Sequence, residues 1–402
     1  MLELPLDLLQ TLTLAAVVYF IGIQVKKRIG WVDRLNIPAA VVGGLLFTGV
    51  TVLAHNRFAT IQLDTTAQPV LSVAFFTSIG MGASLALLRR GGIQVGIFLA
   101  FATAFCFVQN FIGIGIARAF GENPLLGVMA GSVTLVGGPA TGMAFAPVFE
   151  TAGLTGAGAL ALAAATMGIV FGGLTGSPAA TFLIKRQGLR STVASAAEAR
   201  AELETPEPAL IVEVEQEDTP LIRNMVILAL AMGVGSVVSG WIQALGVTLP
   251  AYIGAMLIAS VIRNIDDATH WLRIDQRAME FIGNLALNIF LTVALMDLKL
   301  WQLAGVALPL IVILIVQVVV VVLAAITVSY VLMGRDYDSA VMSSGFVGFV
   351  LGTTANAVAN MRALVARYGP APRAFLVVPL VGAFFIDFTN AIIITFFLNW
   401  LS

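Results

Sequence analysis

Long apolar segments divide this chain, and they constrain its fold more than any other feature. Ten of them reach or approach the roughly 20 residues that a helix needs to cross the hydrocarbon core of a bilayer. They cover residues 6–25, 37–54, 67–88, 93–119, 157–184, 224–245, 248–262, 279–296, 301–332 and 374–398. Only 11% of the 402 residues are charged, against about 25% in soluble proteins. The sequence therefore predicts an all-α polytopic membrane protein.

Several functional classes have no support in the composition. The net charge of −1 gives no basis for nucleic-acid binding. One cysteine, Cys106, and two histidines, His55 and His270, are too few for a His/Cys metal cluster, so we expect neither a transition metal nor a cofactor. The sequence also lacks the His-Glu-x-x-His pattern and a nucleotide-binding glycine loop with its lysine. An intramembrane enzyme and an ATP-driven pump are therefore weak alternatives.

The distribution of basic residues predicts an orientation, because short cytoplasmic loops carry an excess of Lys and Arg. With the N-terminus outside, all but Arg57, Arg118 and Lys299 of the 21 basic residues fall on the cytoplasmic side. We therefore expect both termini on the periplasmic or external face. Residues 187–223 are polar and acidic, which predicts a solvated, flexible cytoplasmic linker, and a regulatory role for it stays open.

Other charged residues are expected to lie in water. A cytoplasmic connection carries a group of them, which we interpret as a solvated loop with a short amphipathic helix. Its members are Asp266, Asp267, His270, Arg273, Asp275 and Arg277. Asp336 and Asp338 lie near the predicted end of a span and are likewise expected to be solvated.

The linker separates two halves, residues 1–186 and 224–402, whose sequences resemble each other. Pro38-Ala39 recurs as Pro250-Ala251 at an offset of 212 residues, and Gly138 recurs as Gly352 at 214. In the last span of each half Gly168, Phe171 and Thr175 match Gly382, Phe385 and Thr389, also at 214. Five crossings per half is an odd number, so the two copies are predicted to be inverted repeats, which are typical of secondary transporters.

Two further segments, at about 124–150 and about 337–367, differ from ordinary spans. They occupy corresponding places in the two halves. Each has two apolar arms around a kink of small residues, at 137–142 in the first half and 352–356 in the second. An arm of about 13 residues is only about 20 Å long as a helix. We therefore predict two re-entrant hairpins that enter the membrane from opposite faces, with their non-helical backbone buried or lining a cavity.

The two kinks are the predicted substrate site. Helix ends expose N–H groups that suit a carboxylate, and carbonyl groups that suit sodium. The candidate substrate-binding residues are Thr134, Gly137, Gly138, Thr141, Gly142, Ser344, Gly352, Thr353, Thr354 and Asn356. Glycine and serine also mark close helix packing in lipid, and that alternative stays open for each kink taken singly.

Asp387 is a lone carboxylate near the middle of the last apolar segment. Such a group costs several kcal/mol unless an ion or a partner meets it. Asn390 lies three residues on and shares its helical face, and Asn360 and Asn110 are further amides in apolar segments. We predict a sodium site from these four residues. The alternatives are that Asp387 pairs with an arginine or caps a hairpin arm, and that the amides only lock helices together.

Four stretches carry a family resemblance: residues 378–387 with Asn390-Ala391, residues 359–361, Gln109-Asn110, and residues 298–301. In these the chain resembles the bacterial sodium/glutamate symporters over nearly its full length. The resemblance implies a homodimer in the bacterial inner membrane with five plus five spans and re-entrant loops. It also implies sodium-driven glutamate symport by an elevator-like motion.

The chain departs from the family pattern where the substrate is expected to bind. It has Pro139-Ala140 where members usually carry a histidine. Phe346-Val347 stand where members usually have the His-Cys pair of a Gly-His-Cys-Gly run. Asn356 falls in a stretch that usually includes proline. A related amino acid or dicarboxylate therefore remains an alternative substrate. Separate alternatives are proton coupling in place of sodium, and an ion channel, which would also use re-entrant loops.

Overall fold

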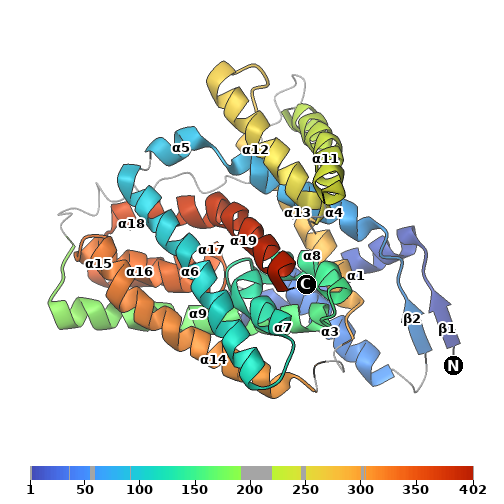
Figure 1. Ribbon diagram of the computed structural model, residues 1–402, viewed down its shortest axis with the longest axis horizontal. Helices are drawn as coiled ribbons and strands as arrows, with labels where there is room; N and C mark the ends of the chain where they lie inside the picture. The colour runs from blue at the N-terminus through green and yellow to red at the C-terminus, as the bar shows by residue number, and fades with distance from the viewer. Residues whose placement is uncertain are drawn as a thin grey trace.

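The computed structural model describes residues 2–35, 37–54, 59–90, 92–191, 220–245, 250–299, 303 and 305–401, and these are almost entirely helical (Figure 1). The exception is a parallel pair of short strands, β1 (Leu2–Pro5) and β2 (Ala59–Gln62). Both strands lie outside the long helices, where paired extended segments satisfy each other's backbone groups. The expectation of an all-α chain is wrong at this one point.

The first half supplies five helices at the predicted spans. They are α1 (Leu8–Arg28), α3 (Ala39–Ala54), α4 (Ala67–Gly82), α6 (Gly92–Ala119) and α9 (Ala157–Gln187), with α2 (Gly30–Arg34) and α5 (Leu85–Arg90) as short connections. A capping box begins α1, because the Asp7 carboxylate accepts the Gln10 N–H at 2.8 Å and the Gln10 side chain accepts the Asp7 N–H at 3.1 Å.

The second half contains the other five predicted spans. Its helices are α11 (Pro220–Ala244), α12 (Ala251–Thr269), α13 (Gln276–Met296) and α14 (Ala307–Ala324), the last continued by π-helix η3 (Ala325–Ser329) and α15 (Tyr330–Leu332). The final span consists of α18 (Pro372–Leu380), π-helix η4 (Val381–Phe385) and α19 (Ile386–Leu401). The connection between the halves, residues 192–219, lies outside the described residues.

Helix therefore occupies most of the described residues of each of the ten predicted spans. Six described helices are long and apolar enough to cross a membrane: α1, α6, α9, α11, α13 and the continuous 307–332 segment. The other four spans are shorter, more polar or interrupted. With its composition, this makes the chain a multi-pass membrane protein.

Two helical hairpins occupy the interrupted segments. Hairpin 1 consists of α7 (Pro124–Val128), π-helix η1 (Met129–Val133) and α8 (Gly138–Thr151), and hairpin 2 of α16 (Tyr337–Val350) and α17 (Thr354–Tyr368). The arms are separated by residues 134–137 in hairpin 1 and 351–353 in hairpin 2, so both predicted kinks extend too far: residues 138–142 and 354–356 are already helical. The first arm is also broken at Gly131, with φ −98° and ψ −130°, which was not predicted.

The helices pack as two groups (Figure 1). In one group α4 packs against α12 and α13, while α3 packs against α1 and α13. The stacked rings of Phe76 and Tyr252, with centroids 4.0 Å apart, join α4 to α12. The other group contains α6, α14, both hairpins, α9 and the α18–α19 span. In this group α9 contacts both hairpins, and it is the element around which the candidate site is built.

Candidate functional site where two hairpins meet

The turns of the two hairpins lie against each other. Gly138 begins α8 with φ +68°, a conformation that glycine adopts without strain. A Cβ atom on Gly138 would lie 3.6 Å from the Gly352 carbonyl oxygen and 3.9 Å from Cγ2 of Thr353. Three of the predicted substrate residues are therefore neighbours. The N-terminal ends of α8 and α17 come together at this point.

Helix α9 holds both turns. A Cβ atom on Gly168 would lie 2.4 Å from the carbonyl oxygen of Leu351 and 2.7 Å from Cδ2 of Leu135. Leu351 belongs to the turn of hairpin 2 and Leu135 to the turn of hairpin 1. Because no side chain fits at Gly168, the α9 backbone approaches both turns more closely than any other residue would permit.

The break in hairpin 1 is closed by two amide side chains. The Ser132 N–H donates to Oδ1 of Asn110 on α6, and Nδ2 of Asn390 on α19 donates to the Ser132 carbonyl oxygen, both at 2.9 Å. Gly131 takes this backbone out of helical geometry, so its peptide groups need other partners. Three polar atoms of this clamp remain buried without a hydrogen-bond partner in the described chain: Asn110 Nδ2, Ser132 Oγ and Asn390 Oδ1.

Hairpin 2 is fixed to α9 by two other amides. Nδ2 of Asn356 donates to the Ile169 carbonyl oxygen at 2.8 Å, and Nδ2 of Asn360 donates to the Gly172 carbonyl oxygen at 2.9 Å. Thr353 caps α17 by accepting the Asn356 N–H on its hydroxyl at 3.3 Å. These side chains therefore position the turn. Oδ1 of Asn356 is left buried without a partner among the described residues.

Asp387 lies in the first turn of α19, half-buried, between contacts with both hairpins. Five residues before it, the Gly382 carbonyl oxygen accepts the hydroxyl hydrogen of Thr354 in hairpin 2. Three residues after it, Asn390 binds Ser132 in hairpin 1. In the described ranges no hydrogen bond or ion pair involves the Asp387 carboxylate, and the arginine partner weighed from the sequence is not seen there.

The remaining candidates pack around the turns. The Thr134 hydroxyl donates to the Met129 carbonyl oxygen at 2.7 Å within hairpin 1. Gly137 precedes α8, Thr141 is buried in its first turn, and a Cβ on Gly142 would lie 2.9 Å from Cβ of Ala161 on α9. Ser344 is buried in α16, and its hydroxyl has no partner in the described part of the chain. Thr134 and Gly142 thus contact protein atoms close to the turn of hairpin 1, and their prediction as substrate-binding residues stays a prediction.

Gln109 and Gln317 link helices, as expected of amides within apolar segments, and Gln109 connects α6 to hairpin 2. Nε2 of Gln109 donates to the Val350 carbonyl oxygen at 3.2 Å, and Nε2 of Gln317 on α14 donates to the Gln109 carbonyl oxygen at 2.7 Å. Both Oε1 atoms are buried without partners among the described residues. In the sequence, the feature that points to these contacts is a pair of adjacent polar side chains, Gln109 and Asn110, within an apolar segment.

Asp336 and Asp338, which we expected to be solvated, are only partly exposed and contact Arg373. Nη2 of Arg373 contacts both carboxylate oxygens of Asp336 at 2.7 Å, and the Arg373 N–H donates to Asp338 at 3.0 Å. Burial raises the pKa of Asp336, but hydrogen bonds from Ser339 and Arg373 outweigh it and hold that pKa below its usual value. Burial raises the pKa of Asp338. These contacts join the base of hairpin 2 to α18.

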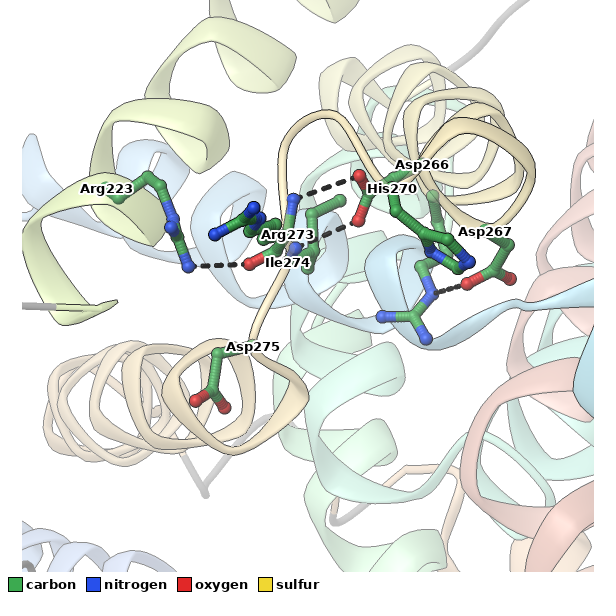
Figure 2. A pocket seen from close by; sticks show the side chains of 8 residues that line it. Arg223, Asp266, Asp267, His270, Arg273, Ile274 and Asp275 are labelled. Atoms are coloured by element: carbon green, nitrogen blue, oxygen red, sulfur yellow. Dashed lines mark hydrogen bonds and ion pairs between the residues drawn. The ribbon is translucent and has the colours of Figure 1, made fainter.

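Asp266 is a second correction, because it is only 5% exposed instead of solvated. Its carboxylate accepts the N–H groups of Leu272, Arg273 and Ile274 at 2.8, 3.0 and 2.9 Å. It helps line a cavity of about 540 Å³ beside the α12–α13 connection, which contains none of the candidate site residues (Figure 2). The sequence could not distinguish this carboxylate from its exposed neighbours.

Comparisons with known proteins place these features in a family. Residues 4–370 match the sodium/glutamate symporter family model. The sodium/glutamate symporters of Escherichia coli (strain K12) and Shigella flexneri are each 38% identical to this chain over 395 residues, with 98% of both chains covered. The sodium/glutamate symporter of Haemophilus influenzae is 37% identical, with 95% of both chains covered. The chain belongs to the sodium/glutamate symporter family.

Proposed function

We propose that this protein is a secondary active transporter that carries glutamate or a similar small carboxylate together with sodium. Relatives named as sodium/glutamate symporters support the proposal over 95–98% of the chain. The single observation that carries it is the position of Asp387. This carboxylate lies between contacts to both hairpins and has no protein partner among the described residues.

The coupling ion is assigned from the oxygen atoms that remain available. A carboxylate in an apolar segment needs a cation, and carboxylate and amide oxygens are ligands that sodium accepts. Asp387 and Asn390 keep such oxygens, because Asn390 uses only its Nδ2 in binding Ser132. The Oδ1 atom of Asn110 already accepts the Ser132 N–H, and its Nδ2 group, unpaired among the described residues, is a donor that cannot bind a cation. We therefore assign Asn110 and Asn360 positioning roles beside a sodium site at Asp387 and Asn390.

The substrate carboxylate is assigned to the meeting point of the turns. Helices α8 and α17 both begin there, and the free N–H groups at helix N-termini favour an anion. Thr141, Thr353 and Thr354 lie in the first turn of α8 or at the start of α17 and add hydroxyl groups. Ser344, Gly352 and Asn356 complete the surroundings of the second turn.

The departures from the family pattern bear on the choice of substrate. Phe346 is buried in an aromatic cluster, with its ring centroid 4.7 Å from that of Phe101 and 5.3 Å from that of Phe105. An aromatic side chain therefore fills this position by packing on α6. The proposal accordingly covers glutamate, a related amino acid and a dicarboxylate.

Alternating access is supported by the packing of the two halves. Several helix contacts have a counterpart in which the two halves exchange roles. Helix α12 packs on α4, and its counterpart is α3 on α13; likewise α11 packs on α12, and α1 packs on α3. Helix α14 packs on α9, and its counterpart is α6 on α19. This is the pattern expected of inverted repeats. The group of α1, α3, α4 and α11–α13 would then be the static part of a homodimer. The group that holds both re-entrant hairpins would be the part that moves in an elevator-like step.

The proposed topology follows the basic residues. Both termini lie on the periplasmic side of the inner membrane, and the acidic linker at 187–223 lies in the cytoplasm, although most of it falls outside the described residues. Cysteine labelling tests this orientation. A membrane-impermeant reagent added to intact cells should label a cysteine at Asp7 in a Cys106→Ala background, and should not label one at Arg186.

Uptake into proteoliposomes tests the function. Purified protein is reconstituted and given labelled glutamate, aspartate or a dicarboxylate under an inward gradient of either sodium or protons. We expect accumulation of a small carboxylate against its gradient with sodium only. Accumulation driven by protons alone would favour the proton-coupled alternative. Downhill movement that never exceeds equilibrium would favour a channel.

A further inference from the structure

A second polar site lies between the ends of α11 and α12 and the connection that leads to α13. It is a cavity of about 540 Å³ lined by Arg223, Arg263, Asp266, Asp267, His270, Arg273, Ile274 and Asp275 (Figure 2). Its formal charges nearly balance, so its preference for a ligand depends on which groups are already used by the protein.

The three carboxylates are all engaged. Asp266 accepts three backbone N–H groups of the connection. Asp267 lies 3.0 Å from Nε of Arg263 and also accepts the hydroxyl hydrogen of Ser84. Asp275 caps α13 by accepting the N–H groups of Arg277 and Ala278 at 2.8 and 3.1 Å, and Figure 2 shows its carboxylate turned away from the arginine side chains. These contacts occupy oxygen atoms of all three acids, and among them only Asp267 forms an ion pair with an arginine in the described residues.

Two of the arginines, Arg223 and Arg273, form no ion pair with a carboxylate among the described residues. Arg223 reaches the connection from α11 and donates from Nη2 to the Arg273 carbonyl oxygen at 2.7 Å, which uses one of its five N–H donors. Both side chains are exposed, and Figure 2 shows them on the same side of the connection. Guanidinium groups that line one pocket repel each other unless an anion lies between them.

The backbone of the connection is built to hold this arrangement. His270 and Arg273 have φ values of 52° and 48°, in the left-handed region that residues with side chains seldom occupy. Asp266 compensates by binding the N–H groups that follow. The same elements also carry exposed apolar side chains next to lining residues, namely Ile222 at 62%, Ile265 at 52% and Trp271 at 81% exposure.

We propose that this pocket binds a phosphate-bearing anion, supplied by the headgroup of an anionic phospholipid. Planar guanidinium groups match phosphate oxygens in pairs, and a tryptophan beside them is typical of the membrane interface. Ile222 and Ile265 offer apolar contact to the acyl chains. The pocket lies on the face that the basic residues predict to be cytoplasmic, where basic pockets between helices bind lipid headgroups.

Isothermal titration and thermal unfolding of the full-length protein in neutral detergent test this proposal. The probes are short-chain phosphatidylglycerol, short-chain phosphatidylcholine and inorganic phosphate. The variants are the double substitution Arg223→Ala/Arg273→Ala and the matched control Arg277→Ala, which removes an exposed arginine from the neighbouring helix turn. Each lost charge-assisted hydrogen bond corresponds to a roughly tenfold loss of affinity.

Phosphatidylglycerol is expected to bind the wild type and Arg277→Ala alike, to raise their Tm, and to bind the double alanine variant at least tenfold more weakly. Phosphatidylcholine should bind none of them at the pocket. If inorganic phosphate binds as tightly as phosphatidylglycerol, the pocket binds a phosphate anion, but its ligand is free phosphate and not a lipid headgroup. Equal binding of phosphatidylglycerol to the wild type and the double variant would overturn the proposal. If the alanine variant fails to fold, the comparison uses Arg223→Gln/Arg273→Gln, judged by the same outcomes.

Discussion

Gly138 and Gly352, which match each other in the sequence comparison of the two halves, are neighbours where the turns of the two hairpins meet. A Cβ atom on Gly138 would be 3.6 Å from the Gly352 carbonyl oxygen, an ordinary van der Waals distance. Residues 214 positions apart in sequence are thus neighbours in space. This proximity is consistent with the proposed inverted repeats, whose substrate site would lie between the two copies.

Substituting Gly168 tests the close approach of α9 to both turns. The Cβ of Gly168→Ala would lie 2.4 Å from the Leu351 carbonyl oxygen, so the turn of hairpin 2 must move. We expect a cost of about 1–3 kcal/mol, seen as a lower Tm, and at least a tenfold loss of sodium-driven uptake. The control is Gly96→Ala on α6, where nothing lies within 4 Å of the added atom. Equal behaviour of the two variants would contradict the close contact.

The clamp on Ser132 predicts that Asn390 and Asn110 act together. Asn390→Ala leaves the Ser132 carbonyl oxygen buried and unpaired, which costs about 1–3 kcal/mol and lowers the Tm. It also removes a proposed sodium ligand, so the sodium concentration for half-maximal uptake should rise. Asn399→Ala, an exposed amide further along α19, is the matched control.

The double variant Asn390→Ala/Asn110→Ala should lose less stability than the sum of the single variants, because both side chains hold the same peptide unit. Strict additivity of the changes in unfolding free energy would show that the two amides act independently.

The hydroxyl of Thr354 predicts a link between hairpin 2 and the span that carries Asp387. Thr354→Val keeps the shape of the side chain but removes the hydrogen bond to the Gly382 carbonyl oxygen. The loss is about 1 kcal/mol, which corresponds to about a fivefold increase in the half-saturating sodium concentration. In Thr395→Val the lost bond is internal to α19, so its sodium dependence should match the wild type. If the sodium dependence of uptake in Thr354→Val equals that of the wild type, this hydrogen bond does not couple hairpin 2 to the sodium site.

The ion pair between Asp336 and Arg373 predicts a pH dependence of stability. The folded pKa of Asp336 lies below its ordinary value, so the pair stabilises the protein above about pH 4 and its contribution is lost as the pH falls through the folded pKa. Both side chains are partly exposed, which limits the contribution to about 1 kcal/mol.

Comparison with Asp336→Asn isolates this contribution, since the raised pKa of Asp338 acts in the opposite sense in both proteins. The difference in Tm between the wild type and the variant should be constant near neutral pH and shrink below about pH 4. A difference that grows on acidification would contradict the assignment.

The sequence predicted those features that depend on local pattern. Helix occurs at all ten predicted spans, because about 20 apolar residues leave a membrane helix as the main way to satisfy the backbone. The helical hairpins also lie where two interrupted segments were found. The turns were misplaced by a few residues, because several small residues stand together at each kink and any of them could form the turn.

The contacts that build the site could not be predicted, because they join distant parts of the chain. Asn110 and Asn390 meet on Ser132 across separations of 22 and 258 residues. Nothing in the local sequence distinguishes these amides from amides that only pack helices. Asp266 was misjudged for a similar reason: its carboxylate is buried by a backbone loop whose left-handed residues carry no glycine signal.

Sodium-driven uptake by Asp387→Asn tests the central claim most directly, because this change removes the charge and keeps the shape. In proteoliposomes with matched amounts of protein, labelled glutamate should no longer accumulate under a sodium gradient, while Asp387→Glu keeps a measurable part of the coupling. A Tm close to that of the wild type would show that the variant is folded. Near-normal accumulation by Asp387→Asn with an unchanged dependence on sodium would contradict the account.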